Sequence, residues 1–118
     1  MPNKKYVVLV CGGREFWNPE LVGRTLKTIN PDIIITGGCV RGADYLAQAW
    51  AEASGVHCAI VKAQWEKYGK SAGVRRNLAM LWLKPDLVVA FPGGRGTAHM
   101  LKSAQDAGVP VMEVSSDG

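Results

Sequence analysis

The sequence has few cysteines and histidines, the residues that form disulfide bonds or bind structural metals. It has three cysteines and two histidines among 118 residues, and no Cys-x-x-Cys pair. Disulfide frameworks use an even number of cysteines and zinc sites use closely spaced ligands, so neither is expected. We therefore predict no metal and no cofactor. Cys11 and Cys58 are expected to be small buried side chains, whereas Cys39 lies among glycines.

Long hydrophobic runs and long charged runs are also missing. No apolar stretch approaches the ~20 residues of a membrane helix, and residues 1–6 lead directly into a short β-type run instead of a signal peptide. We expect a cytoplasmic protein without a membrane partner. No five like charges follow one another, which argues against a basic tail for nucleic acid. The net charge of +4 nevertheless favours an anionic partner.

What the chain does have is the composition of one globular domain over residues 1–118. Hydrophobic residues make up 47% and charged residues 20% of it. A chain of this length buries roughly 65% of the surface that its unfolded form exposes. This is enough for a hydrophobic core that needs no disulfide bond or structural metal. Five β-branched or apolar runs alternate with helical patterns, and they predict strands over residues 6–11, 32–36, 56–61, 87–91 and 109–114.

Four helices are predicted between these strands, over residues 18–30, 43–55, 71–84 and 97–108. Asn18, Ser71 and Thr97 are the expected N-caps, and Trp50 and Trp82 fall in the apolar stripes that should face the core. Residues 62–70 are expected to be a loop. This alternation predicts an α/β fold, a single Rossmann-like domain with a five-stranded parallel sheet and helices on both faces.

Three glycine-rich loops follow the first, second and fourth predicted strands. Ligands of open parallel sheets bind at the carboxyl ends of the strands, where glycine permits close backbone approach and helix N-termini attract anions. Five of the six arginines lie in these loops or at the start of the third helix, and arginine binds phosphate bidentately. The glycines match neither the dinucleotide fingerprint nor a P-loop. We predict a ligand bearing phosphate or carboxylate, bound by Gly12, Gly13, Arg14, Gly37, Gly38, Arg41, Gly42, Asp44, Arg76, Asn77, Gly93, Gly94, Arg95, Gly96 and Thr97.

Several of these residues have two interpretations. Asp44 either stabilises a helix start or accepts hydrogen bonds from a ribose or a base. Thr97 either caps a helix or also touches a phosphate, and Asn77 is either solvated or reads a base. Trp17 and Trp65 lie in loops, where an aromatic side chain either packs or stacks on a base. No Ser-His-Asp or Cys-His set can be assembled, so no catalytic residue is assigned.

At these loops the sequence resembles the SLOG superfamily, and within it the YspA-like, cpYpsA-related branch, which occurs in phages and bacteria. It is more distantly similar to the "Lonely guy" phosphoribohydrolases and to the DNA-processing SMF proteins. The elements that carry the resemblance are residues 12–16, 36–38, 41–44 and 91–97, together with Trp65, Ala72, Gly73, Arg76, Asn77 and Met80.

The resemblance implies a nucleotide-related function, but one position departs from the hydrolases. Their motif Pro-Gly-Gly-x-Gly-Thr-x-x-Glu carries a catalytic glutamate, and Met100 stands at its place here. Methionine cannot transfer a proton or stabilise an oxocarbenium ion. The economical interpretation is a homo-oligomeric protein that binds a nucleotide-derived small molecule, ADP-ribose-like or a cyclic nucleotide, as a sensor or as a phage-type sponge of immune signals. The alternatives are an N-glycosidase that uses Asp44 or Glu15 as its acid, and binding of single-stranded DNA.

Overall fold

Five parallel strands form one sheet at the centre of the molecule, in the order β3-β2-β1-β4-β5. The computed structural model describes residues 4–116. The strands are β1 (Val7–Cys11), β2 (Ile33–Thr36), β3 (His57–Ile60), β4 (Leu87–Ala90) and β5 (Val111–Glu113), and each neighbouring pair is parallel. The predicted α/β architecture is therefore confirmed, and each strand end coincides with the predicted one or lies up to two residues inside it.

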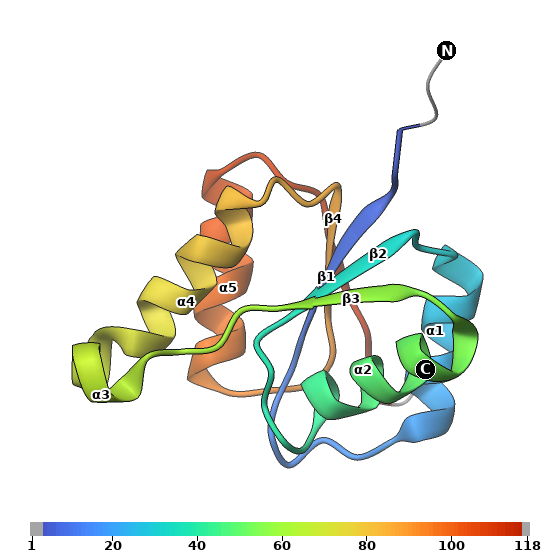
Figure 1. Cartoon of the computed structure of the whole chain (residues 1–118), viewed down its shortest axis with the longest axis horizontal. Helices are drawn as coiled ribbons and strands as arrows, with labels where there is room; N and C mark the ends of the chain where they lie inside the picture. Colours follow the sequence, from blue (N-terminus) through green and yellow to red (C-terminus); the bar gives the residue numbers. More distant parts are fainter. Residues whose placement is uncertain (1–3, 117–118) are drawn as a thin grey trace.

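Helices cover both faces of this sheet, as Figure 1 shows. They are α1 (Pro19–Ile29) and α2 (Ala43–Ser54) on one face, and α4 (Ala72–Trp82) and α5 (Arg95–Asp106) on the other. Successive side chains of a strand point to opposite faces. Val8 and Val10 accordingly pack with the first helix pair, and Leu9 packs with the second. No helix in residues 4–116 is long and apolar enough to cross a bilayer.

The predicted N-cap positions are right for α1 and α4 and wrong for α5. The Leu21 N–H donates to Asn18 Oδ1 at 3.0 Å, the expected N-cap bond. Gly94 is the N-cap of α5, so Thr97 lies inside that helix. Ser71 precedes α4 as predicted, but its side chain forms no capping hydrogen bond, because a short helix α3 (Trp65–Tyr68) and a 3-10 turn η1 (Gly69–Ser71) run straight into α4 and leave Ser71 in helical geometry. Its hydroxyl donates to the Tyr68 carbonyl instead.

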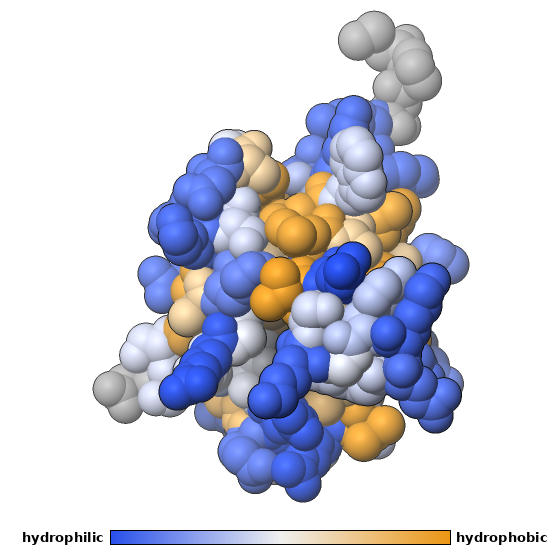
Figure 2. Space-filling view, turned by 90° about the vertical axis from the view of Figure 1, so that its left-hand side faces the viewer, coloured by the Kyte–Doolittle hydropathy of each residue, from blue (hydrophilic) through white to orange (hydrophobic). Residues whose placement is uncertain are grey.

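The core-facing side of α4 also differs from the prediction. Trp82 is 80% exposed, and Val74 and Leu78 are exposed on the same side of the helix. The buried side carries Asn77 and Met80 instead, since polar contacts with α5 hold Asn77 inside. Trp50, by contrast, packs partly buried against the core as predicted. Figure 2 shows hydrophobic side chains gathered on the side of the molecule that carries α4.

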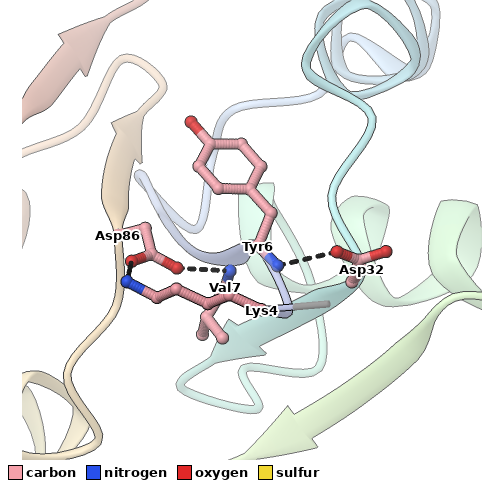
Figure 3. A network of polar contacts seen from close by, with 5 residues as sticks. All are labelled: Lys4, Tyr6, Val7, Asp32 and Asp86. Carbon is pink, nitrogen blue, oxygen red and sulfur yellow. Dashed lines mark hydrogen bonds and ion pairs between the residues drawn. The ribbon is translucent and has the colours of Figure 1, made fainter. Parts of the chain in front are cut away.

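Two carboxylates fix the start of the central strand, as Figure 3 shows. Just before β2, Asp32 accepts a hydrogen bond from the Tyr6 N–H at 2.7 Å. Just before β4, Asp86 accepts one from the Val7 N–H at 2.9 Å and pairs with Lys4 Nζ at 3.1 Å. The bond from Val7, and then Lys4, lower the pKa of Asp86 below its ordinary value. The edge opposite the predicted site is thereby tied together by charge-assisted hydrogen bonds.

Asp86→Asn is expected to reduce the free energy of unfolding by about 1 kcal/mol at neutral pH, because it replaces a charge-assisted acceptor with a neutral one. The lowered pKa means that the carboxylate stabilises the fold fully above its unfolded-state pKa. That stabilisation is lost as the pH falls through the folded-state pKa. Urea unfolding at several pH values should therefore show the variant and the wild type converging in acid.

The matched control is Asp106→Asn, which removes an exposed pair with Lys102 in α5. An exposed pair of this kind contributes little. A gap for Asp86→Asn that stays constant from pH 7 into the acid range would contradict the role given to the Asp86 charge.

Candidate functional site

A cleft of about 1130 Å³ lies where the strand order changes direction between β1 and β4. Its walls are the loops after β1, β2 and β4 together with α4 and the segment before it. Open parallel sheets bind ligands at this position, and the volume suits a small molecule. Thirteen residues singled out from the sequence line it: Gly12, Gly13, Arg14, Gly37, Gly38, Asp44, Trp65, Arg76, Asn77, Gly94, Arg95, Gly96 and Thr97.

Four of the singled-out residues lie outside this cleft. Gly42 and Gly93 are packed between loops, and the Trp17 ring stacks on Tyr45 with their centroids 5.9 Å apart. Arg41 forms an ion pair with Glu15, with Nη2 and Oε1 2.6 Å apart. Arg41 instead lines a neighbouring hollow of about 570 Å³, which Arg14 also borders.

Three cleft residues with chemically active side chains were missed in the sequence. Lys62 follows β3 closely, so its place at the carboxyl edge was a usable signal. Lys70 lies in η1 and His99 lies one turn into α5, and neither belongs to a glycine-arginine loop. The place of Lys70 in the cleft depends on how α3, η1 and α4 are arranged beside the loops at the sheet edge.

The glycines of the three loops serve two different purposes. A Cβ on Gly42 would overlap the Gly13 carbonyl oxygen, and a Cβ on Gly93 would overlap the Thr97 hydroxyl. A Cβ on Gly12 would stand 2.6 Å from that of Ala43. These glycines let one loop pack directly on another. The Gly13 N–H donates to the Pro92 carbonyl at 2.9 Å, which holds the loops after β1 and β4 together.

Gly94 and Gly96 are different, because nothing lies within 4 Å of a Cβ placed on either of them. They flank Arg95 at the start of α5, where the first N–H groups of a helix have no partner within the helix. Such a start attracts anions through these N–H groups and through the helix dipole. The open glycines leave room for an anion to reach the backbone here.

Arg76 is held in the cleft wall by two hydrogen bonds. Its Nη1 donates to the Gly37 carbonyl at 3.1 Å, and its Nε donates to Asn77 Oδ1 at 3.3 Å. Asn77 in turn donates through Nδ2 to the Gly96 carbonyl at 3.2 Å. Asn77 is buried, so the expectation of a solvated residue is wrong. This pair of neighbours connects the loop after β2 to the start of α5.

The same network indicates the tautomer of the neutral His99 ring. Asn77 Oδ1 accepts from Arg76, so its amide nitrogen Nδ2 faces His99 Nδ1 at 3.1 Å and donates to it. In this tautomer the ring proton is on Nε2, which lies 3.4 Å from Ser103 Oγ.

Asp44 is the one carboxylate that lines the cleft among the described residues. It is 9% exposed, and its Oδ2 accepts a hydrogen bond from the Cys39 N–H at 3.2 Å. Burial raises its pKa, while that hydrogen bond and the Arg76 charge act in the opposite direction. Asp44 thus connects the start of α2 to the loop after β2 through the Cys39 N–H. The sequence alone did not distinguish such a structural role from ligand binding.

Cys11, at the end of β1, is buried as predicted, whereas Cys39 and Cys58 are half-buried. Burial, with the nearby Asp44 charge, raises the pKa of Cys11 to about 12. It is therefore a thiol at neutral pH and a poor nucleophile. Met100, which replaces the glutamate of the hydrolases, is fully buried in the core beneath α5 and does not line the cleft.

Comparison with known proteins gives matches in both sequence and structure. The model of the YspA, cpYpsA-related SLOG family matches residues 6–68. The Gene 61 protein of Mycobacterium phage D29 is 41% identical over 87 residues, which cover 68% of this chain and 70% of that protein. The molybdenum cofactor binding protein of the phototrophic bacterium Rippkaea orientalis superposes with a TM-score of 0.74 at 20% identity, covering 97% of this chain and 78% of the other. The last match supports the fold alone.

Proposed function

Because this chain belongs to the YspA, cpYpsA-related SLOG family, we propose that its cleft binds a nucleotide or a nucleotide-derived small molecule. The observation that carries the proposal is the charge of the cleft. Arg14, Lys62, Lys70, Arg76 and Arg95 line it, against the single carboxylate of Asp44. Cationic walls around an open helix N-terminus are the chemistry that recognises phosphate.

The phosphate is proposed to bind at Gly94 and Gly96, where no other atom crowds the backbone and the Arg95 side chain lines the cleft. Trp65 supplies the complementary apolar surface. Its ring is 57% exposed and lies against Gly73 of α4, a position where a Cβ would be 3.4 Å from the ring. A flat, exposed indole at the cleft wall suits stacking on a base.

The sequence relative is a phage protein, which favours a role in phages. The structural neighbour is named a molybdenum cofactor binding protein, and at 20% identity it supports only the shared fold. We propose that the chain acts as a sensor, or as a sponge that sequesters a nucleotide signal. The predicted homo-oligomer stays a prediction, which the exposed apolar side of α4 supports.

A nucleotide should raise the melting temperature, since a ligand that binds only the native state stabilises it by about 2.7 kcal/mol at a hundredfold excess over Kd. The test is a thermal-shift screen of nucleoside mono- and diphosphates, ADP-ribose forms and cyclic dinucleotides, with uncharged sugars as controls. Unchanged melting curves across the phosphorylated panel would refute the proposal.

The N-glycosidase alternative now depends on Asp44, since Glu15 is exposed and paired with Arg41 outside the cleft. A buried carboxyl with a raised pKa is the kind of group that acts as an acid. Chromatography of AMP and GMP after incubation separates the two functions. We expect no free base, and turnover on the order of one per second would favour the hydrolase.

A further inference from the structure

The cationic side chains of the cleft fall into two groups. Arg14 and Arg95 belong to the loops after β1 and β4, and Arg14 borders Gly94 in the adjoining hollow as well. Lys62, Lys70 and Arg76 come from the segment after β3 and from α4. Of these, Arg76 and Lys62 lie against Gly37 and Gly38 in the loop after β2. The second group contains two of the residues that the glycine-arginine motifs do not indicate.

Gly37 and Gly38 lie between two members of this second group. On one side, Arg76 Nη1 bonds to the Gly37 carbonyl, and a Cβ on Gly37 would overlap the guanidinium. On the other side, a Cβ on Gly38 would stand 3.2 Å from Cγ and 3.5 Å from Cε of Lys62. The aliphatic stem of Lys62 therefore lies along the loop. Glycine at position 37 leaves room for the Arg76 guanidinium, and Gly38 packs closely on Ile60 as well as on the Lys62 stem, so two cations approach the same stretch of backbone.

Most of this charge has no counter-ion within the protein. In residues 4–116, Arg14, Lys62, Lys70 and Arg95 form no ion pair, in contrast to Arg41, which is paired with Glu15. Asp44 is already engaged by the Cys39 N–H and lies beside Arg76. Like charges gathered in one cleft repel each other, and a ligand with matching negative charge removes that repulsion.

The two groups are also joined by a short, rigid connection. Arg76 bonds to the loop after β2, and its neighbour Asn77 bonds to Gly96 at the start of α5. Two adjacent side chains of one helix thus contact both loops, and both loops line the same cleft, where one ligand can contact them together.

Resting on the proposed function, we propose that the ligand carries two phosphate groups, as a nucleoside diphosphate does. One phosphate binds at Gly94 and Gly96 with Arg95 and Arg14. The second binds over Gly37 and Gly38 with Lys62, Lys70 and Arg76. A nucleoside monophosphate fills only the first position and leaves the second group of cations uncompensated.

The experiment compares AMP with ADP, and inorganic phosphate with pyrophosphate, by isothermal titration at fixed ionic strength. The second phosphate should raise affinity by about ten- to hundredfold, the effect of a hydrogen-bonded charged group. The double variant Lys62→Ala/Lys70→Ala should weaken ADP much more than AMP and so lose most of that gain. The variant Lys27→Ala/Lys102→Ala removes the same charge from exposed positions on α1 and α5 and should keep the gain.

The outcomes separate this inference from the proposed function. Equal affinities for AMP and ADP, or a gain that survives in Lys62→Ala/Lys70→Ala, would overturn the second phosphate position while leaving nucleotide binding intact. A gain for pyrophosphate over phosphate without any benefit from the nucleoside would support the two anion positions and count against a nucleotide. A gain lost equally in both lysine variants would show a diffuse charge effect and overturn the inference.

Discussion

Arg95→Ala is expected to weaken binding of a phosphorylated ligand by about ten- to hundredfold, because it removes a charged hydrogen-bond donor at the start of α5. Arg95→Lys should restore only part of this loss, since a point charge lacks the bidentate geometry of guanidinium. Isothermal titration with the nucleotide that the thermal-shift screen identifies measures each effect, after circular dichroism has shown that the variants are folded.

Two arginines outside the cleft provide controls of equal charge. Arg41 is paired with Glu15, and Arg24 lies on α1 next to Glu20. Alanine at either position should change affinity by no more than about threefold, within the contribution of an exposed pair. If Arg24→Ala weakened binding as much as Arg95→Ala, net charge and not a shaped site would determine affinity. A polyanion such as single-stranded DNA would then be the better candidate.

Gly42→Ala is expected to reduce the free energy of unfolding by about 2–6 kcal/mol. Gly42 has φ +78° and ψ −152°, a backbone region that is essentially restricted to glycine and unfavourable for alanine by about 1–3 kcal/mol. The added Cβ would also overlap the Gly13 carbonyl oxygen and lie 2.6 Å from Arg14 Cα, and such overpacking costs about 1–3 kcal/mol. Urea unfolding of the variant measures the sum of the two effects.

Gly55→Ala is a control with a positive φ and no clash. Gly55 ends α2 in the left-handed helical region with φ +73°, and nothing lies within 4 Å of a Cβ placed there. This control should cost only about 1–2 kcal/mol. Equal losses for Gly42→Ala and Gly55→Ala would mean that the packing of loop on loop contributes little to stability.

Features encoded in a short stretch of sequence were predictable. The alternation of β-branched runs with helical patterns gave the parallel sheet with both faces covered, since each run is itself the buried strand. The Asn18 cap needs only the three residues that follow it. The three glycine-arginine loops were predictable as a group because parallel strands place their carboxyl ends along one edge.

Features that depend on contacts between distant segments were not predictable. Arg14 and Arg41 follow similar glycines, yet Glu15 draws Arg41 out of the cleft. Trp82 fits an apolar stripe, but Asn77 takes the buried side of α4 through partners on α5. Lys70 lies in the cleft in a segment, residues 65–71, that is helical and continuous with α4 instead of the predicted loop.

The packing of the loops on one another also determines which parts of the cleft can vary among related sequences. Gly12, Gly42 and Gly93 each meet a neighbouring loop or helix start, so a side chain at any of them must be matched by a change elsewhere. Trp65 and Lys70 are exposed on the segment before α4 and carry no such constraint. Single substitutions at exposed positions such as Trp65 and Lys70 can therefore change the surface of the cleft. Gly12, Gly42 and Gly93, in contrast, can change only together with their neighbours, so this scaffold can vary one wall of the cleft while the packing of its loops stays the same.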